Sequence, residues 1–348
     1  MGEAVRIRRA ARAFDPDSLP RVAAIATQSP ADFAKVVSTE SPVILKGTFD
    51  RWPALAAGRA GSAQLNAYLK GMDRGAPAPV MEASSRSGGR FAYGADLREF
   101  SFSKRRAGVP DTLDRIERLI GEPRAPYVAI QMLPLAQHMP EFVRQNPMPL
   151  LPADVGPRLW VGGRVRTQTH NDRDHNLACV IAGRRRFLLF PPEQVGNLYV
   201  GPLDNPPPLS LVDPENPDLD RFPRYARAFA AARAAWLDPG DAIFVPKHWW
   251  HHVVSLDPYN AMVNYWWGDT AAGLGNPNDC FLTALLALKD LPPGERAYWR
   301  EMFDTYVFRT GGDPVGHIPE PLQGALGAMS PSFRAMLRQQ LKIATLKS

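Results

Sequence analysis

The sequence predicts a mainly β fold with added helices, built as an antiparallel barrel or jelly roll. Between about residue 157 and residue 267, short runs of β-branched and aromatic residues alternate with glycine and proline turns. Such punctuation is typical of antiparallel strands that close into a barrel or pack as two sheets. After about residue 270, apolar residues recur at helical spacing, which indicates a helical C-terminal region.

Several runs are predicted as strands because they are short, apolar and bounded by turn residues. They cover residues 42–47, 127–133, 159–163, 177–181, 186–190, 241–245 and 261–267. A helix is predicted over 31–37, because Ser29-Pro30 is a suitable start signal. Residues 202–223 are rich in Pro and Asp, which excludes a central strand and indicates a functional loop or a covering segment.

The C-terminal region is predicted to contain three helices. The first covers about 279–289, the second runs from Pro292 or Pro293 to about 308, and the third begins at Ser330-Pro331. The third helix carries an apolar stripe that consists of Phe333, Met336, Leu337, Leu341 and Ala344. This stripe either packs on the chain's own barrel or forms a homodimer interface.

Composition and charge indicate an ordinary globular protein. The chain has 348 residues, of which 45% are hydrophobic and 22% charged, so it can bury a sizeable core. Because we find no signal region and no span for a bilayer, we expect a cytoplasmic protein without a membrane partner. Cys179 and Cys280 are far apart, which favours a reducing compartment. The net charge of +6 permits nucleic-acid binding, but no motif supports it.

A metal site is predicted from three side chains. His170 and Asp172 form an H-x-D pair, and residues i and i+2 of a strand point to the same face. His251, in the string VPKHWWHHVVS, lies far downstream, so the fold must bring it back. Two His and one carboxylate on one face of a metal form the facial triad of non-haem Fe(II) oxygenases.

These residues belong to a longer, ordered set of motifs. In chain order they are T-x-x-H-x-D-x-x-x-N, G-R-R-R-F-L-L-F-P-P-E-Q, R-F-P, D-P-G-D-A-I-F-V-P-x-x-W-W-H-H-V-x-S and V-N-Y-W. The set resembles the JmjC-type, cupin-fold Fe(II)/2-oxoglutarate oxygenases, in particular the hypoxia-inducible-factor asparagine hydroxylase and its bacterial cupin-like relatives. A lone H-x-D pair is a weak signal, whereas this order and spacing are specific.

The resemblance implies a double-stranded β-helix with iron at its open mouth. Residues 1–270 would form the JmjC/cupin-like catalytic domain with an N-terminal extension, and 271–348 a helical region suited to homodimer formation. Fe(II), the co-substrate 2-oxoglutarate and O2 would be required. By motif position, the iron ligands would be His170, Asp172 and His251. His252 could compete for the last role, but the His directly after W-W is the family's ligand.

The co-substrate contacts are also implied by motif position. Arg185 stands where the asparagine hydroxylase has the lysine that binds the far carboxylate of 2-oxoglutarate, and arginine can bind a carboxylate bidentately. Its neighbours Arg184 and Arg186 should point the other way by strand alternation. The other residues at or near family co-substrate positions are Thr167, Asn176, Asn264, Tyr127 and Gln131.

The implied reaction is hydroxylation of a C–H bond, or N-demethylation where the target carries methyl groups. The resemblance favours a protein or peptide side chain as the substrate, with a small molecule as the alternative. The sequence leaves two other functions open. One is a non-oxidative metal-binding cupin, which typically uses more His ligands and a Glu. The other is an inactive binding module, which the arginine at position 185 favours.

Overall fold

The structure, a computed structural model, describes residues 14–26, 29–203, 208–268 and 274–347. The chain divides into two compact units, residues 1–268 and 269–348. All of the described strands belong to the first unit, and the second is helical. Within the described residues, no helix is both long and apolar enough to cross a membrane.

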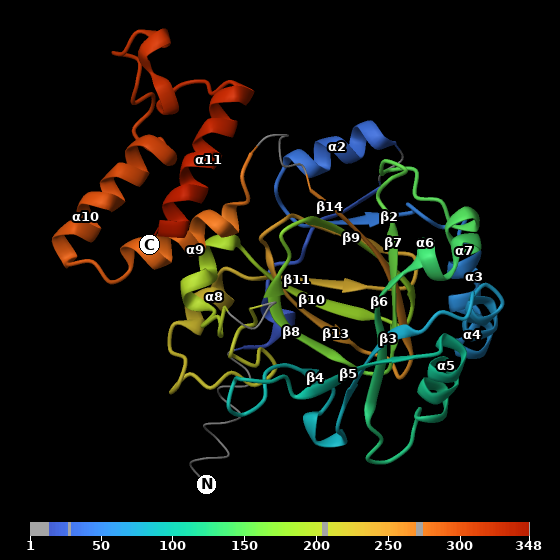
Figure 1. Cartoon of the computed structure of the whole chain (residues 1–348). Helices are drawn as coiled ribbons and strands as arrows, with labels where there is room; N and C mark the ends of the chain where they lie inside the picture. The colour runs from blue at the N-terminus through green and yellow to red at the C-terminus, as the bar shows by residue number, and fades with distance from the viewer. Residues whose placement is uncertain (1–13, 27–28, 204–207, 269–273, 348) are drawn as a thin grey trace. The chain divides into compact units, whose positions relative to one another are not determined.

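The first unit contains two β-sheets (Figure 1). The larger sheet is built, in spatial order, from β1 (Ala24–Ala26), β2 (Val43–Lys46), β12 (Ala242–Val245), β9 (His175–Ala182), β14 (Asn260–Trp267), β7 (Pro157–Gly162), β6 (Tyr127–Pro134), β3 (Ala78–Ala83) and β5 (Phe102–Ala107). The smaller sheet is built from β11 (Arg233–Leu237), β10 (Arg185–Phe190), β13 (Trp250–Ser255), β8 (Arg166–Asn171) and β4 (Arg90–Phe91). Most neighbouring strands are antiparallel, which confirms the predicted jelly-roll fold with added helices.

An apolar core fills the space between the two sheets. Its side chains come from β9, β12 and β14 of the larger sheet and from β10, β11 and β13 of the smaller one. Phe187 and Leu189 of β10 belong to this core, whereas Leu188 and Phe190 lie in a separate cluster on the other face of the strand. This alternation identifies which side chains point into the barrel.

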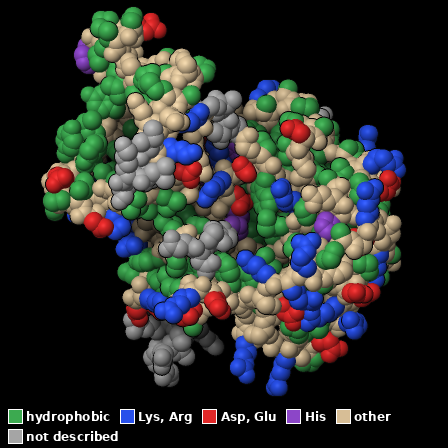
Figure 2. All heavy atoms as spheres, viewed as in Figure 1, with side chains coloured by type: hydrophobic (Ala, Val, Ile, Leu, Met, Phe, Trp, Pro, Cys, Tyr) green, Lys and Arg blue, Asp and Glu red, His purple; other side chains and the backbone are tan. Residues whose placement is uncertain are grey.

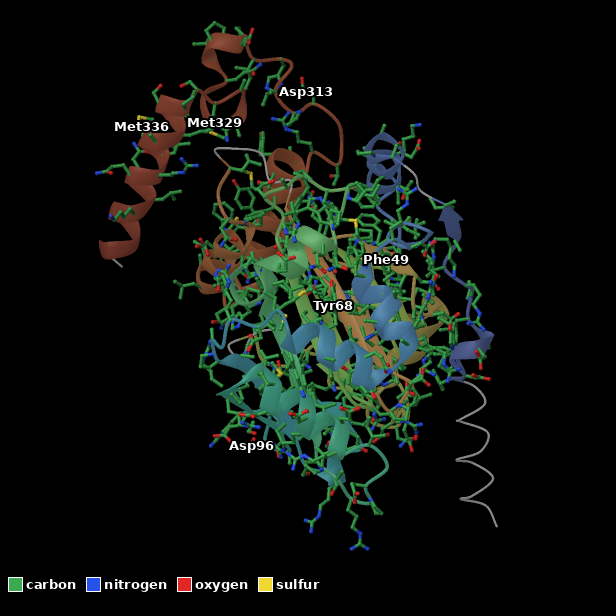
Figure 3. The ribbon with its side chains drawn as sticks, turned by 90° about the vertical axis from the view of Figure 1, so that its right-hand side faces the viewer. Phe49, Tyr68, Asp96, Asp313, Met329 and Met336 are labelled. Carbon is green, nitrogen blue, oxygen red and sulfur yellow. The ribbon has the colours of Figure 1, made fainter. Side chains whose placement is uncertain are left out.

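Helices cover the outer face of the larger sheet (Figure 3, in which Phe49 and Tyr68 are labelled). They are α2 (Pro30–Ser38), α3 (Pro53–Ala60), α4 (Ser62–Lys70), α5 (Val109–Arg118), α6 (Leu135–His138) and α7 (Pro140–Gln145). Phe33 of α2, Leu113 of α5 and Phe142 of α7 are buried in one cluster with the outward residues of β9 and β14. Helix α2 begins as predicted, since Ser29 Oγ accepts a hydrogen bond from Asp32 N.

The smaller sheet is covered by α8 (Tyr225–Ala230) and by the Pro-rich segment before it. Val212, Phe222 and Tyr225 pack with Leu188 and Trp250 on the outer face of this sheet. The described parts of 202–223 therefore form a covering segment, one of the two predicted possibilities. Residues 204–207 lie outside the described residues.

The second unit contains α9 (Pro277–Leu288), α10 (Pro293–Met302) and α11 (Pro331–Lys347), with a π-helical turn over Phe303–Val307. Helix α11 begins where predicted, and Ser330 Oγ accepts from Phe333 N. Within its predicted stripe, Met336 is 45% and Leu341 65% exposed. The side chain of Ala344 lies outside the described residues.

Candidate metal centre and co-substrate pocket

Adjacent strands of the smaller sheet bring the predicted triad together. His170 on β8 is directly opposite His251 on β13, and Asp172 follows β8 by one residue. One ligand atom from each of the three side chains can be chosen so that all lie within 4.8 Å of one another. The two imidazole ring centroids are 4.3 Å apart. A single metal ion can therefore contact all three side chains.

Backbone carbonyls orient both imidazoles. Nδ1 of His170 lies 2.9 Å from the carbonyl of Gln168, and Nδ1 of His251 lies 3.0 Å from the carbonyl of Trp249. A carbonyl can only accept, so each Nδ1 must carry the proton, which leaves the Nε2 lone pair free for a metal. Burial, and next the neighbouring His170, lower the pKa of His251 to about 4. His251 is therefore neutral at pH 7, as a ligand must be.

The carboxylate of Asp172 is held by two further donors. Trp266 Nε1 donates to Asp172 Oδ2 at 3.1 Å, and Asn176 Nδ2 donates to the same oxygen at 3.4 Å. This oxygen lies 3.7 Å from Nε2 of His251. Two oriented imidazoles and one oriented carboxylate are a donor set that fits Fe(II).

Arg185 points into the barrel and has no partner there. It lies on β10, on the same face as Phe187 and Leu189, and is 6% exposed. Within the described residues its side chain forms no hydrogen bond or ion pair, and its Nε is buried without an acceptor. Burial lowers the pKa of Arg185 to about 10, so the group remains cationic at neutral pH. A buried cation without a counter-charge is the arrangement expected of a pocket that receives an anionic ligand.

Ser255 is the neighbour of Arg185 across the sheet, and sequence reasoning did not single it out. The two residues pair between β10 and β13, and the hydroxyl of Ser255 is also buried without a partner. Leu189, four residues after Arg185 on β10, pairs with His251 on β13. Four residues correspond to about 13 Å of strand, a span that 2-oxoglutarate and a long arginine side chain can bridge together. Arg185 and Ser255 therefore fit the far carboxylate of this co-substrate.

Asn264 and Asn176 belong to a chain of hydrogen bonds that ends at the triad. Trp160 Nε1 donates to Asn264 Oδ1 at 2.7 Å, and Asn264 Nδ2 donates to Asn176 Oδ1 at 3.4 Å. Asn176 in turn donates to Asp172. Thr167 lies on β8 opposite Val253, whose side chain belongs to the inter-sheet core.

The structure separates the two candidates on β6. Gln131 is buried. Together with Met132 it forms a bulge opposite Trp160, whose indole donates the first hydrogen bond of the chain that leads to Asp172. Tyr127 instead lies at the other end of β6, where it lines a surface cavity beside Gly163 and Arg164. The fold thus brings Gln131, but not Tyr127, toward the hydrogen-bond chain of the triad.

The chain neighbours of His251 and Arg185 do not face the barrel interior. His252 is on the opposite face of β13 from His251, and its Nε2 lies 3.5 Å from Glu215 Oε1. Arg186 also pairs with Glu215, and Arg184 binds Asp257 through both guanidinium and backbone donors. These pairings leave Arg185 as the member of the arginine run that faces the barrel interior.

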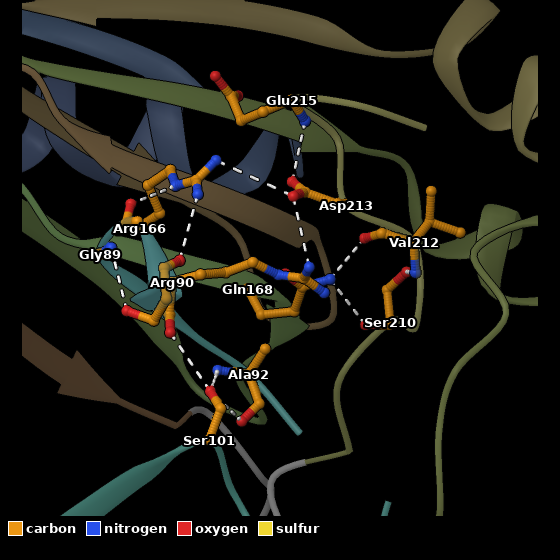
Figure 4. A network of polar contacts seen from close by, with 12 residues as sticks. Gly89, Arg90, Ala92, Ser101, Arg166, Gln168, Ser210, Val212, Asp213 and Glu215 are labelled. Atoms are coloured by element: carbon orange, nitrogen blue, oxygen red, sulfur yellow. Dashed lines mark hydrogen bonds and ion pairs between the residues drawn. The ribbon is translucent and has the colours of Figure 1, made fainter. Parts of the chain in front are cut away.

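A polar network supports the strand that carries His170 (Figure 4). The side-chain amide of Gln168 donates to the carbonyls of Ser210 and Val212, and its oxygen accepts from Arg90 Nε at 3.2 Å. Asp213 forms an ion pair with Arg90 at 3.4 Å. The covering segment is thereby attached to β8 next to the carbonyl that orients His170.

A cavity of about 470 Å³ opens beside Trp266. Its lining includes Pro134, Asp154, Arg158 and Trp267. The guanidinium of Arg158 lies 5.0 Å from the ring centroid of Trp266, the indole that donates to Asp172. A substrate segment in this cavity would lie directly behind a ligand-orienting side chain.

Comparison with known proteins agrees with the fold. A family model described as a cupin-like domain matches residues 30–272. The chain is 40% identical to HSPB1-associated protein 1 of Homo sapiens over 112 residues, which are 31% of this chain and 22% of that protein. It is 37% identical to lysine-specific demethylase JMJ31 of Arabidopsis thaliana over 110 residues, 31% of this chain and 20% of that protein.

A longer match is to lysine-specific demethylase 8 of Danio rerio. It is 27% identical over 236 residues, which are 66% of this chain and 53% of that protein. The chain thus spans between about a fifth and about half the length of these relatives.

Proposed function

Because the chain belongs to the cupin-like domain family and has the JmjC-type cupin fold of 2-oxoglutarate oxygenases, we propose that it hydroxylates a C–H bond of a protein or peptide side chain. Fe(II) would be the metal and 2-oxoglutarate and O2 the co-substrates. The observation that carries this proposal is the triad itself, with three ligand atoms within 4.8 Å and both imidazoles oriented by backbone carbonyls.

Each part of the site has a defined task in this proposal. His170 and His251 present Nε2 lone pairs to the metal, and Asp172 supplies a negative ligand held by Trp266 and Asn176. Arg185 and Ser255 bind the far carboxylate of the co-substrate, and the apolar residues of the inter-sheet core keep water from the pocket. The bound metal and co-substrate supply the oxidising chemistry.

The proposed substrate class is supported by the names of the relatives. Two of them are called lysine-specific demethylases, and one is named for its association with HSPB1. Protein substrates are therefore favoured over small molecules for this chain. Hydroxylation is proposed in preference to demethylation because it requires no methylated target.

The experiment that tests the proposal measures succinate formation by the purified protein with Fe(II), ascorbate and 2-oxoglutarate under air. We expect succinate from the wild-type protein and none from the His170→Ala variant. Binding of 2-oxoglutarate to the metal-loaded protein is measured in parallel by calorimetry. Binding without turnover would support a module that keeps the pocket but lacks activity. Absence of both binding and turnover would reject the oxygenase and favour a non-oxidative cupin.

A further inference from the structure

A second cavity, of about 870 Å³, lies at the other end of the barrel from the triad. Gly163 and Arg164, in the turn before β8, and Pro258, between β13 and β14, form part of its wall. His170 is at the far end of β8 from this turn, and His251 is at the far end of β13. The cavity is therefore separate from the iron site and is not used in the proposed reaction.

The charges around this cavity are predominantly positive. Its lining contains Arg86, Arg124 and Arg164 but a single acidic residue, Glu122. Within the described residues, the side chains of Arg86 and Arg124 form no hydrogen bond or ion pair. The side chain of Glu122 likewise forms none there. Because three arginines face one carboxylate, the lining has a net positive charge.

A carboxylate outside the lining, Asp257, interacts electrostatically with Arg164. The pKa of Asp257 is held below its usual value chiefly by the hydrogen bond from Arg184, with a smaller effect from Arg164. Arg184 engages both oxygens of Asp257, at 2.8 and 3.0 Å. Asp257 is thus already paired, and it leaves the excess charge of the cavity in place.

One residue of the lining has an uncommon backbone conformation. Arg124 has a φ of 61°, in the left-handed region that non-glycine residues seldom adopt. Gly89 has a φ of 82°, and a Cβ there would meet the carbonyl of Arg164 at 2.3 Å and the ring of Tyr127 at 3.1 Å. The left-handed conformation of a non-glycine residue such as Arg124 is retained where the surroundings enforce it and is frequent at ligand sites. At Gly89, the absence of a side chain leaves room for the carbonyl of Arg164 and the ring of Tyr127.

The remaining wall of the cavity is apolar. Ile116, Leu119 and Ile120, in and after helix α5, line it together with Pro126 and Pro258. A volume of this size exceeds what a free phosphate ion needs and lies in the range of organic ligand pockets. Arginine binds both carboxylate and phosphate bidentately, and a phosphate group has enough acceptor oxygens to engage more than one arginine.

We propose that this cavity binds a phosphate ester of roughly nucleotide size, with its phosphate on Arg86, Arg124 and Arg164 and its organic part on the apolar wall. The assignment does not depend on the proposed oxygenase activity. Tyr127, which we had expected at the co-substrate, would belong to this site instead.

Calorimetric titration of the full-length protein with AMP and, separately, with inorganic phosphate tests the proposal. We expect AMP to bind more tightly than phosphate, and the Arg86→Gln/Arg124→Gln double variant to lose about tenfold or more in affinity for each arginine. Arg164→Gln is a second, single-site test. Arg51→Gln, at an exposed arginine outside the cavity, and Arg185→Gln, in the co-substrate pocket, should keep the wild-type affinity.

Four results would overturn the assignment. One is the absence of AMP binding to the wild-type protein, and another is an unchanged affinity in the double variant when circular dichroism shows it folded. The third is a short single-stranded RNA that binds more tightly than AMP through the same arginines, because the ligand would then be a nucleic-acid strand. Loss of AMP binding in Arg185→Gln would move the site to the barrel interior and also reject it.

Discussion

At the residue scale, most groups of the candidate site are held in place by specific neighbours. The indole of Trp266 is an example, because its Nε1 donates a hydrogen bond to the carboxylate of Asp172. Arg185 is the opposite case, since it is held by no partner at all among the described residues. These two residues lead to separate predictions.

Replacement of Trp266 by Phe should weaken metal binding while it preserves most of the packing. The variant loses the Nε1 donor at 3.1 Å from Asp172, and loss of such an outer hydrogen bond typically costs about 10- to 100-fold in metal affinity. Titration with Co(II), followed by its visible absorption, measures the affinity. Trp267→Phe is the matched control, because its indole packs against Phe33 and Phe244. Equal Co(II) affinities in the two variants would contradict the assigned role of Trp266.

Replacement of Arg185 by Met should stabilise the protein without co-substrate and abolish co-substrate binding. An unpaired buried cation is costly, so its removal should raise the free energy of unfolding by on the order of 1 kcal/mol. Urea unfolding gives this quantity, and the shift of the midpoint on addition of 2-oxoglutarate and Mn(II) reports binding.

The control for this experiment is Arg184→Met, which removes the neighbouring arginine that is paired with Asp257 at the surface. This variant should be no more stable than the wild type and should keep the midpoint shift with 2-oxoglutarate. Should Arg185→Met be destabilised and still show the shift, Arg185 would not be the carboxylate partner.

At the scale of elements, the apolar strands could be predicted and the ligand-bearing strands could not. The observed β9, β10 and β14 cover the predicted apolar runs within a few residues. By contrast, β8 has the sequence RTQTHN, whose polar residues carry the triad and the Gln168 network and give no hydrophobic alternation. Sequence patterns fail where side chains serve a site rather than the core.

The placement of Tyr127 and Gln131 illustrates a second reason. Both were assigned to the co-substrate because they lie on one predicted strand, but Tyr127 lies four residues, about 13 Å, from Gln131 along β6. Only Gln131 lies in the bulge between Ile130 and Leu133. A bulge redirects the side chains beyond it, and the sequence contains no signal that locates it. Ser255 was missed because a single serine at the end of a motif is not distinctive without its neighbour across the sheet.

The covering segment should be anchored chiefly through Gln168. In Gln168→Leu the carbonyls of Ser210 and Val212 lose their buried donor, and Arg90 loses an acceptor. An unsatisfied buried group costs about 1–3 kcal/mol, so the free energy of unfolding should fall by at least this amount. Urea unfolding measures the change, with Gln64→Leu on the exposed face of α4 as the control. A loss no greater than that of the control would show that packing alone holds the segment.

At the scale of the whole molecule, the two units differ in how much apolar surface they bury. The first unit has several internal clusters of buried side chains, whereas Val315 is the one buried hydrophobic residue among those described in the second. Hydrophobic side chains lie openly on the surface of the C-terminal helices (Figure 2). Leu286 is 80%, Leu322 74% and Phe308 64% exposed. Exposed apolar surface of this kind is typical of a surface that another protein covers.

We therefore expect the C-terminal unit to form a homodimer in solution. A second copy is a suitable partner because a two-fold axis pairs the same apolar surface with itself, and such dimers are the commonest oligomers. Sedimentation velocity of the wild-type protein should give the mass of two chains, and Leu286→Glu/Phe308→Glu should give the mass of one. Val195→Glu, at a residue of the barrel unit that is 51% exposed, carries a similar substitution and should remain dimeric. A wild-type protein that sediments as a monomer at all concentrations would exclude the homodimer and leave this surface to a different partner.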